Sequence, residues 1–216
     1  MIAAAAPRRP GLGTLFVAAQ LVDIVFFILV LAGVEHMRMV PGMTRMNAMD
    51  LYDMPWDHSL LGAAGWAAGF ALLLRLVNGR WDAGLIGGAV VLSHWLLDLL
   101  VHRPDLTLAG GPPPLGLGLW NLPWVEIPLE LTITFGGLAY FIARTRAHGA
   151  AGRWLPWLLA AVLAALQAVN WLTPQPPAPV DPVPAAASIT ALAAYGVMAA
   201  LAATVAATRT AEKRGA

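Results

Sequence analysis

Three ionisable side chains recur at four-residue intervals inside an otherwise apolar run, namely His94, Asp98 and His102 in SHWLLDLLVHRP. At about 100° per residue, a helix places them within an arc of about 80° and over roughly 12 Å of its length. Two ligands one helical turn apart can bind a single metal ion, and His94 with Asp98 has that spacing. This stripe therefore predicts a metal or catalytic site, or else a structural hydrogen-bond network between helices.

Three other apolar runs carry ionisable groups at the same predicted depth: Glu35 and His36, Asp57 and His58, and Glu126 and Glu130. Asp23 lies deeper, about 18 Å of helix below Glu35, and is a candidate neighbour of His94. An isolated charge in hydrocarbon costs at least ~2.5 kcal/mol, so such groups usually pair with one another, line water or bind an ion. A divalent cation would offset two carboxylates, and neutral imidazoles need no further counter-charge.

These residues lie in or beside six apolar runs, which we place near 13–35, 59–77, 83–102, 123–143, 154–172 and 186–208. Each run is long enough to cross roughly 30 Å of hydrocarbon as a helix. The chain has 216 residues, of which 59% are hydrophobic and 12% charged, as expected of an integral membrane protein. Lipid offers no hydrogen-bond partners to open backbone. The sequence therefore predicts an all-α, polytopic membrane helical bundle of about six transmembrane helices.

The distribution of Lys and Arg predicts that both termini are cytoplasmic. Only three of the thirteen basic residues, Arg38, Arg45 and Arg103, fall in predicted outer segments. The first run is too long for a cleaved signal peptide, so we expect a retained first span. We expect one integral membrane domain over residues 1–216. Within it, 13–143 form a four-helix part that holds the site, and 154–208 form two further spans joined by a Pro-rich outer loop.

Charge and residue usage exclude several kinds of partner. A net charge of +1 with scattered basic residues argues against nucleic acid. The chain has no Cys, so any metal must be held by His, carboxylate or water. Membrane lipid is the expected surrounding, and no residue pattern names a protein partner. The outer segment 36–57 contains six Met and is expected to be a flexible apolar lid.

An HSL segment at the start of one run and SHWLLDLLVHRPDL at the end of the next resemble the YdjM-like family of bacterial inner-membrane proteins, described as metal-dependent hydrolases. The resemblance covers roughly residues 20–135. It implies that His58 is the HSL histidine and that His94 and Asp98 are the family's HxxxD pair. It also implies that Asp23 stands for the acidic residue of the first span. The sequence departs from the family pattern where YDMPWD replaces a His-Arg pair before HSL, and where Asp23 is single rather than doubled.

We therefore expect a metal-dependent hydrolase in the bacterial inner membrane, with its site open to the outer face. The expected substrate is a lipid or a lipid-linked molecule, cleaved at a phosphoester or acyl bond. The expected metal ligands are imidazoles and carboxylates: His58, His94 and Asp98, completed by Asp23 or His36. The expected ion is Zn, with Mn or Mg as alternatives. The expected catalytic residues are Glu126 or Glu130 as general base and His102, which would orient a ligand or protonate the leaving group.

Other interpretations remain open from the sequence. The ionisable stripe can form a proton or cation relay, for which Asp23 and His94 near the midplane are suited. It can also be the docking surface of an accessory subunit in a membrane complex, and two His can hold a haem. Single positions have structural interpretations too, since Asp57 or Ser59 can cap a helix and Glu126 can reach towards the interface.

Overall fold

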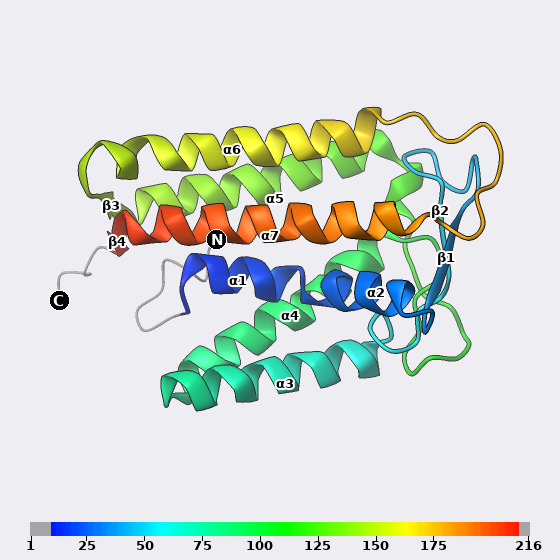
Figure 1. Ribbon diagram of the computed structural model, residues 1–216, viewed down its shortest axis with the longest axis horizontal. Helices are drawn as coiled ribbons and strands as arrows, with labels where there is room; N and C mark the ends of the chain where they lie inside the picture. Colours follow the sequence, from blue (N-terminus) through cyan, green and yellow to red (C-terminus); the bar gives the residue numbers. More distant parts are fainter. Residues whose placement is uncertain (1–9, 212–216) are drawn as a thin grey trace.

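The computed structural model describes residues 10–211 and confirms an all-α membrane bundle (Figure 1). Its helices are α1 Leu12–Ala19, α2 Leu21–Leu31, α3 Leu60–Asn78, α4 Trp81–Val101, α5 Pro123–Ala143, α6 Gly149–Leu172 and α7 Ala185–Ala207, with a short 3₁₀ helix η2 at Leu119–Asn121. Five of them, α3 to α7, are each long and apolar enough to cross a membrane. The chain is therefore a multi-pass membrane protein.

The first span is broken, although we predicted it as one continuous helix over 13–35. Helices α1 and α2 meet at an angle of 54° and together make the sixth candidate span. Gln20 separates them with φ −108° and ψ 4°, outside helical geometry. The Ala19 carbonyl oxygen accepts a hydrogen bond from the His94 side chain instead of from a backbone N–H of the helix. The break therefore supplies a backbone acceptor in the middle of the bundle.

One end of the bundle carries a β-hairpin where we predicted a flexible lid. Strand β1, His36–Met39, pairs antiparallel with β2, Met49–Asp53. The Arg38 guanidinium donates to Asp50 at 2.7 Å across this pair, and Arg103 also binds Asp50. Ion pairs thus connect the hairpin to the end of α4. We call this end of the bundle, with residues 36–59, 102–122 and 173–184, the hairpin end.

Small residues bring the helices into close contact. A Cβ atom on Gly84 of α4 would lie 2.5 Å from the Ala71 carbonyl oxygen of α3. A Cβ atom on Gly13 of α1 would lie 2.8 Å from the Ala199 carbonyl oxygen of α7. Helices in lipid associate through such close packing because hydrophobic burial no longer drives them together. Close packing keeps α3 and α4 side by side, and the Trp95 indole N–H, bonded to the His58 carbonyl oxygen, holds the start of α3 beside the polar stripe of α4.

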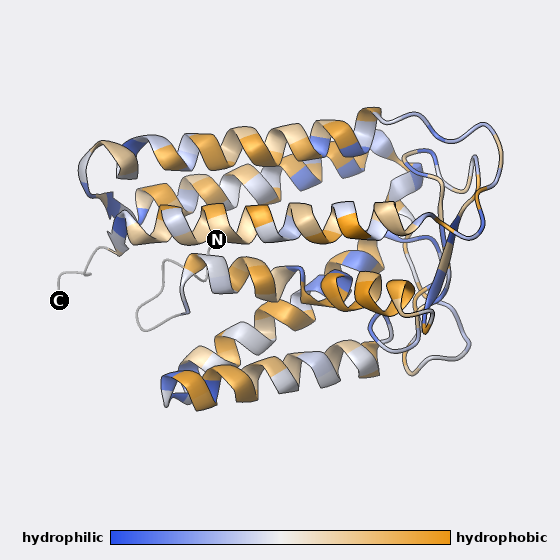
Figure 2. Cartoon of the chain, in the orientation of Figure 1, coloured by the Kyte–Doolittle hydropathy of each residue, from blue (hydrophilic) through white to orange (hydrophobic). Residues whose placement is uncertain are grey.

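The opposite end holds both ends of the described chain. Strand β3, Thr145–Ala147, pairs antiparallel with β4, Arg209–Ala211, and Pro10 lines a cavity together with Ala211. We call it the termini end. Figure 2 shows apolar residues along the helices, with hydrophilic segments gathered at the β1–β2 hairpin and beside β3 and β4. This distribution is that of a bundle with two polar ends and an apolar belt.

Candidate metal centre

Three imidazoles reach the same point in the bundle, and each is fixed through its Nδ1 atom. His58, just before α3, has Nδ1 2.5 Å from Asp57 Oδ1. His94 of α4 has Nδ1 2.7 Å from the Ala19 carbonyl oxygen. His102, at the end of α4, has Nδ1 2.9 Å from Asp105 Oδ1. An acceptor on Nδ1 orients the ring and leaves Nε2 as the free nitrogen, as is usual for metal-binding histidines.

The Nε2 atoms face two carboxylates. The His94 Nε2 atom lies 3.3 Å from Asp23 Oδ1 and 3.2 Å from Asp98 Oδ2. The His58 Nε2 atom lies 3.5 Å from Asp23 Oδ1 and 3.8 Å from Asp98 Oδ2. His102 is farther, with Nε2 4.0 Å from Asp98 Oδ1. One ligand atom each from Asp23, His58 and His94 lies within 4.8 Å of the others, a grouping that can hold a metal ion.

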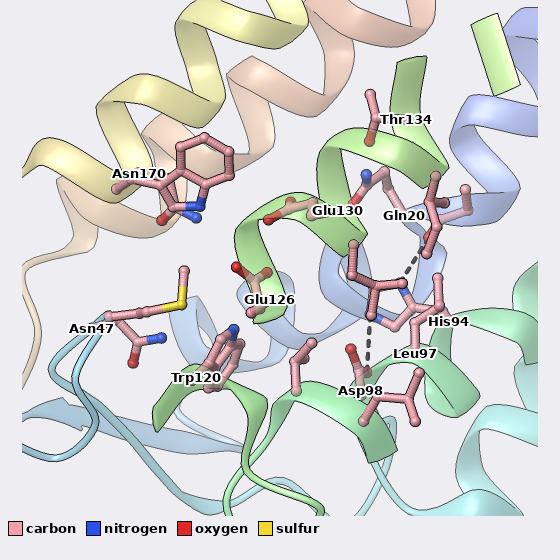
Figure 3. Close-up of a pocket in the computed structure, with 17 residues that line it drawn as sticks. Gln20, Asn47, His94, Leu97, Asp98, Trp120, Glu126, Glu130, Thr134 and Asn170 are labelled. Carbon is pink, nitrogen blue, oxygen red and sulfur yellow. Dashed lines mark hydrogen bonds and ion pairs between the residues drawn. The ribbon is translucent and has the colours of Figure 1, made fainter. Parts of the chain in front are cut away.

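The cluster also contains buried polar atoms that make no hydrogen bond within residues 10–211. His94 Nε2 and Asp98 Oδ2 are buried and lack a hydrogen-bond partner there, although the two atoms face each other (Figure 3). A buried polar atom without a partner is costly. A divalent cation between these atoms would satisfy both, so the donor set fits an ion bound by imidazole and carboxylate.

A network beyond the cluster holds these groups in place. The Tyr195 hydroxyl of α7 donates to Asp23 Oδ2 at 2.9 Å, which leaves Oδ1 for the histidines. The Trp95 indole N–H donates to the His58 carbonyl oxygen at 2.9 Å and so fastens this segment to α4. Ser59 caps α3 by accepting the Gly62 N–H at 3.0 Å. Asp57 is therefore free of the capping role and binds the His58 imidazole instead.

The surrounding carboxylates make this region strongly attractive to cations. Burial lowers the pKa of His58, but hydrogen bonds to Asp23 and Asp57 and the charge of Asp98 outweigh burial and raise it to about 10. Burial raises the pKa of Glu35 to about 8, and the adjacent Asp57 carboxyl acts in the same direction. The Trp56 N–H donates to Glu35 Oε1 at 2.8 Å. In the absence of another cation, the carboxylates thus retain a proton on the imidazole of His58.

Two cavities adjoin the cluster and reach from it to helix α5. The first, of about 350 Å³, is lined by His94 and Asp98 on one side and by Glu126 and Glu130 on the other (Figure 3). The second, of about 500 Å³, reaches Asp23, His58 and Tyr195. Asp98 and Glu130 line both cavities. The two spaces are therefore neighbours across Asp98, with carboxylates on opposite walls.

Most of the predicted site residues come together. Asp23, His58, His94 and Asp98 form the cluster, and His102 lies beside it. Glu126 and Glu130 face the cavity, with Glu126 only 4% exposed.

His36 does not join the cluster, contrary to its predicted place among the metal ligands. Its Nδ1 atom lies 2.7 Å from Asp53 Oδ2 on the surface of the hairpin, and its side chain is 47% exposed. The physical reason is the strand that begins at His36, because side chains of adjacent residues point to opposite sides there. Glu35 turns inward and His36 turns outward.

Three contributors to the site were not among the residues that the sequence predicted for it, since the chemistry was expected in the first four spans. Tyr195 belongs to the last span, the Ala19 carbonyl is backbone, and Asp105 contacts both His102 and Arg103. The signal for Asp105 was its position three residues after His102. A lone Tyr in an Ala-rich span gave no comparable signal.

The fold and the cluster together define a class, a multi-pass membrane helical bundle with a buried or partly buried group of His and Asp that can hold a metal ion. Comparison with known proteins adds no particular identity, since no protein family, curated protein or solved structure matches the chain.

Proposed function

We propose that this protein is a metal-dependent hydrolase that cleaves a lipid or lipid-linked phosphoester or acyl bond. The observation that carries the proposal is the convergence of His58 and His94 Nε2 atoms on the carboxylates of Asp23 and Asp98, with each Nδ1 held by an acceptor. Imidazole with carboxylate favours Zn, and Mn or Mg are the alternatives. The distribution of basic residues supports an inner-membrane location with the hairpin end outside. The resemblance to the YdjM-like family is part of the same proposal.

The residues around the cavity have roles that follow from their positions. A bound divalent ion supplies Lewis-acid chemistry, which polarises a scissile carbonyl or phosphoryl group and acidifies water. Glu126 and Glu130 stand across the cavity from Asp98 and accept the proton that an attacking water releases. His102 lies 4.0 Å from Asp98 and delivers a proton to the leaving group. Asp57 and Ala19 orient the two imidazoles that face the ion.

The lining of the first cavity supports an amphipathic substrate. Leu97 of α4 and Leu129 and Ile133 of α5 supply apolar lining, while Glu126 and Glu130 of α5 supply carboxylates. Leu97 and Ile133 are 43% and 47% exposed, so the apolar lining of this cavity is accessible from outside the protein. A molecule with a hydrocarbon chain can therefore enter sideways, with its reactive group reaching the cluster.

The hydrolase activity is tested with purified protein and two fluorogenic probes of equal chain length, an acyl ester and a phosphodiester. We expect at least one probe to be cleaved, activity to disappear after chelation, and activity to return when Zn²⁺ or Mn²⁺ is added. His148→Ala serves as the control, since His148 lies at the termini end beside Thr210. Cleavage of neither probe by protein that retains its metal would refute the proposal.

One observation favours a second candidate, a proton or cation relay. The helix break at Gln20 places non-helical backbone beside Asp23 and His94, and broken spans of this kind line ion pathways in transporters. A relay requires pH-dependent ion flux in liposomes without a bound metal. Flux that persists after chelation would favour this candidate over the hydrolase.

A further inference from the structure

The cavity wall opposite the metal cluster offers hydrogen-bonding atoms that nothing in the described chain uses. We call it the α5–α6 wall, made of Glu126 and Glu130 of α5 and Gln167, Asn170 and Trp171 of α6. Glu126 is 96% buried, and its Oε2 atom accepts no hydrogen bond from residues 10–211. The Nε2 atom of Gln167 and the Nε1 atom of Trp171 are buried donors without an acceptor in the same part of the chain.

These atoms are complementary to a hydroxyl group. A hydroxyl donates one hydrogen bond and accepts others. Glu126 Oε2 needs a donor, Trp171 Nε1 needs an acceptor, and both residues line the same cavity. In Figure 3 the carboxyl groups of Glu126 and Glu130 lie between Asn170 and the pair His94 and Asp98. A ligand group between the two walls would therefore meet donors, acceptors and the metal cluster together.

The charged residues that line the two cavities disfavour a ligand with an anionic head group. Among residues 10–211, no Lys or Arg lines either cavity, whereas Asp23, Asp98, Glu126 and Glu130 all do. A divalent ion in the cluster is already offset by Asp23 and Asp98. A phosphate would then bring further negative charge beside Glu126 and Glu130, where like charges repel strongly because little water screens them.

We propose that the substrate is an acyl ester lipid with an uncharged, hydroxyl-bearing head group, recognised by the α5–α6 wall; this rests on the proposed hydrolase function. Leu97, Leu129 and Ile133 accommodate the chain, and Glu126 with Trp171 binds the head-group hydroxyl. In the reaction, the oxygen of water bonds to the acyl carbon and the ester C–O bond breaks. Glu130 accepts one proton of the water, His102 delivers a proton to the leaving alkoxide, and the proton held by Glu130 then restores His102. The products are a carboxylic acid and the free hydroxylated head group.

The test compares two lipids that share an oleoyl chain, monooleoylglycerol and oleoyl lysophosphatidic acid. Binding to the purified, metal-free protein in detergent is measured with radiolabelled lipid. We expect monooleoylglycerol to bind at least about tenfold more tightly than the phosphate lipid. Trp171→Phe removes one donor and should weaken monooleoylglycerol binding about five- to tenfold, the usual value of one hydrogen bond. Trp157→Phe is the matched control, because Trp157 lies on the same helix and is 59% exposed.

Replacing both carboxylates should reduce the preference of the protein for monooleoylglycerol over the phosphate lipid. In Glu126→Gln with Glu130→Gln, binding of the phosphate lipid should improve relative to the wild type because the like charges are gone. Equal or tighter binding of lysophosphatidic acid by the wild type would overturn the inference, as would equal effects of Trp171→Phe and Trp157→Phe. Release of oleate is measured separately after metal is restored. Metal-dependent cleavage of a phosphoester without oleate release would overturn this substrate class while supporting a hydrolase; selective binding without any cleavage would refute the hydrolase alone.

Discussion

The two ends of the bundle differ in whether their polar side chains find hydrogen-bond partners within the protein. At the termini end, the Arg209 guanidinium donates to Thr145 Oγ1 and to the carbonyl oxygens of Ile142, Thr145 and Gly152. At the hairpin end, carboxylates accumulate around a few imidazoles. Every buried side-chain atom that lacks a hydrogen-bond partner in residues 10–211 lies between the middle of the bundle and that end.

This difference indicates that the polar groups of the termini end stabilise the fold, while those near the hairpin end bind a ligand. A network of several hydrogen bonds such as that of Arg209 stabilises the helix ends that it joins. Unsatisfied atoms such as His94 Nε2 and Asp98 Oδ2 destabilise the chain unless a ligand completes them. Substitutions in the metal cluster or in the cavity beside it should therefore change metal binding or catalysis, while those at the termini end should change stability alone.

The largest expected effect comes from the carboxylates of the opposite cavity wall. Glu126→Gln with Glu130→Gln should lower the hydrolysis rate by ~10²- to 10⁴-fold, the usual contribution of a general base. Metal content should stay at the wild-type level, because neither residue belongs to the cluster. The measurement is the turnover rate together with elemental analysis. A double variant with the wild-type rate would remove these residues from the mechanism.

A smaller effect is expected from replacing Asp57, the carboxylate that orients the His58 imidazole. Asp57→Ala should weaken metal affinity by about 10- to 100-fold, because the partner on Nδ1 would be lost. Asp53→Ala is the matched control, since Asp53 binds the exposed His36 imidazole in the same way, with 2.7 Å between the atoms. Competition with a chromogenic chelator measures both affinities. Equal effects of the two substitutions would contradict the assignment of His58 as a ligand.

At the termini end, Arg209→Met should lower the free energy of unfolding by about 1–3 kcal/mol, since charged hydrogen bonds to backbone carbonyls are lost. Metal content and turnover should remain unchanged. Thermal unfolding in detergent measures the loss. If the variant also lost metal, the two ends would not be independent.

The smallest effect concerns the buried carboxyl of Glu35, whose pKa is raised from 4.5 to about 8. Because the folded state favours the neutral form, the stability that Glu35 contributes is fully present below pH 4.5 and is lost as the pH rises through about 8. Glu35→Gln, which is neutral throughout, should make the melting temperature less dependent on pH in this window. At pH 8.5 the variant should melt about 2–4 °C above the wild type. An unchanged pH profile would show that Glu35 does not titrate there.

Much of the fold could be predicted from the sequence, because span length and hydropathy follow directly from the thickness of the bilayer. The predicted run at 59–77 and helix α3 at Leu60–Asn78 agree closely. The break at Gln20 could not be foreseen, since neither Gly nor Pro marks it and a tertiary contact to His94 accompanies it. The hairpin was missed for a similar reason, because its strands are short and are stabilised by Arg38, Arg103 and Asp50.

In the candidate site, too, local features could be predicted from the sequence, whereas features that depend on tertiary contacts could not. The spacing of His94 and Asp98 is local information, and it correctly placed both side chains on one face of a helix. Tyr195 lies 172 residues from Asp23 in the chain, and only the packing of α2 against α7 joins them. Glu35 and His36 are adjacent in sequence, so the sequence could not tell which one turns inward. That distinction depends on the register of the hairpin.

The metal content of purified protein tests the central claim most directly. Elemental analysis of the detergent-purified wild type should give about one equivalent of a divalent metal, and the His94→Ala and Asp98→Ala variants should give almost none, because each loses an atom of the cluster. Asp82→Ala, on the same helix as Asp98 but paired with Arg80 at the termini end, should retain the wild-type amount. Folded wild-type protein without metal, and unable to take up Zn²⁺ or Mn²⁺, would contradict the existence of the site.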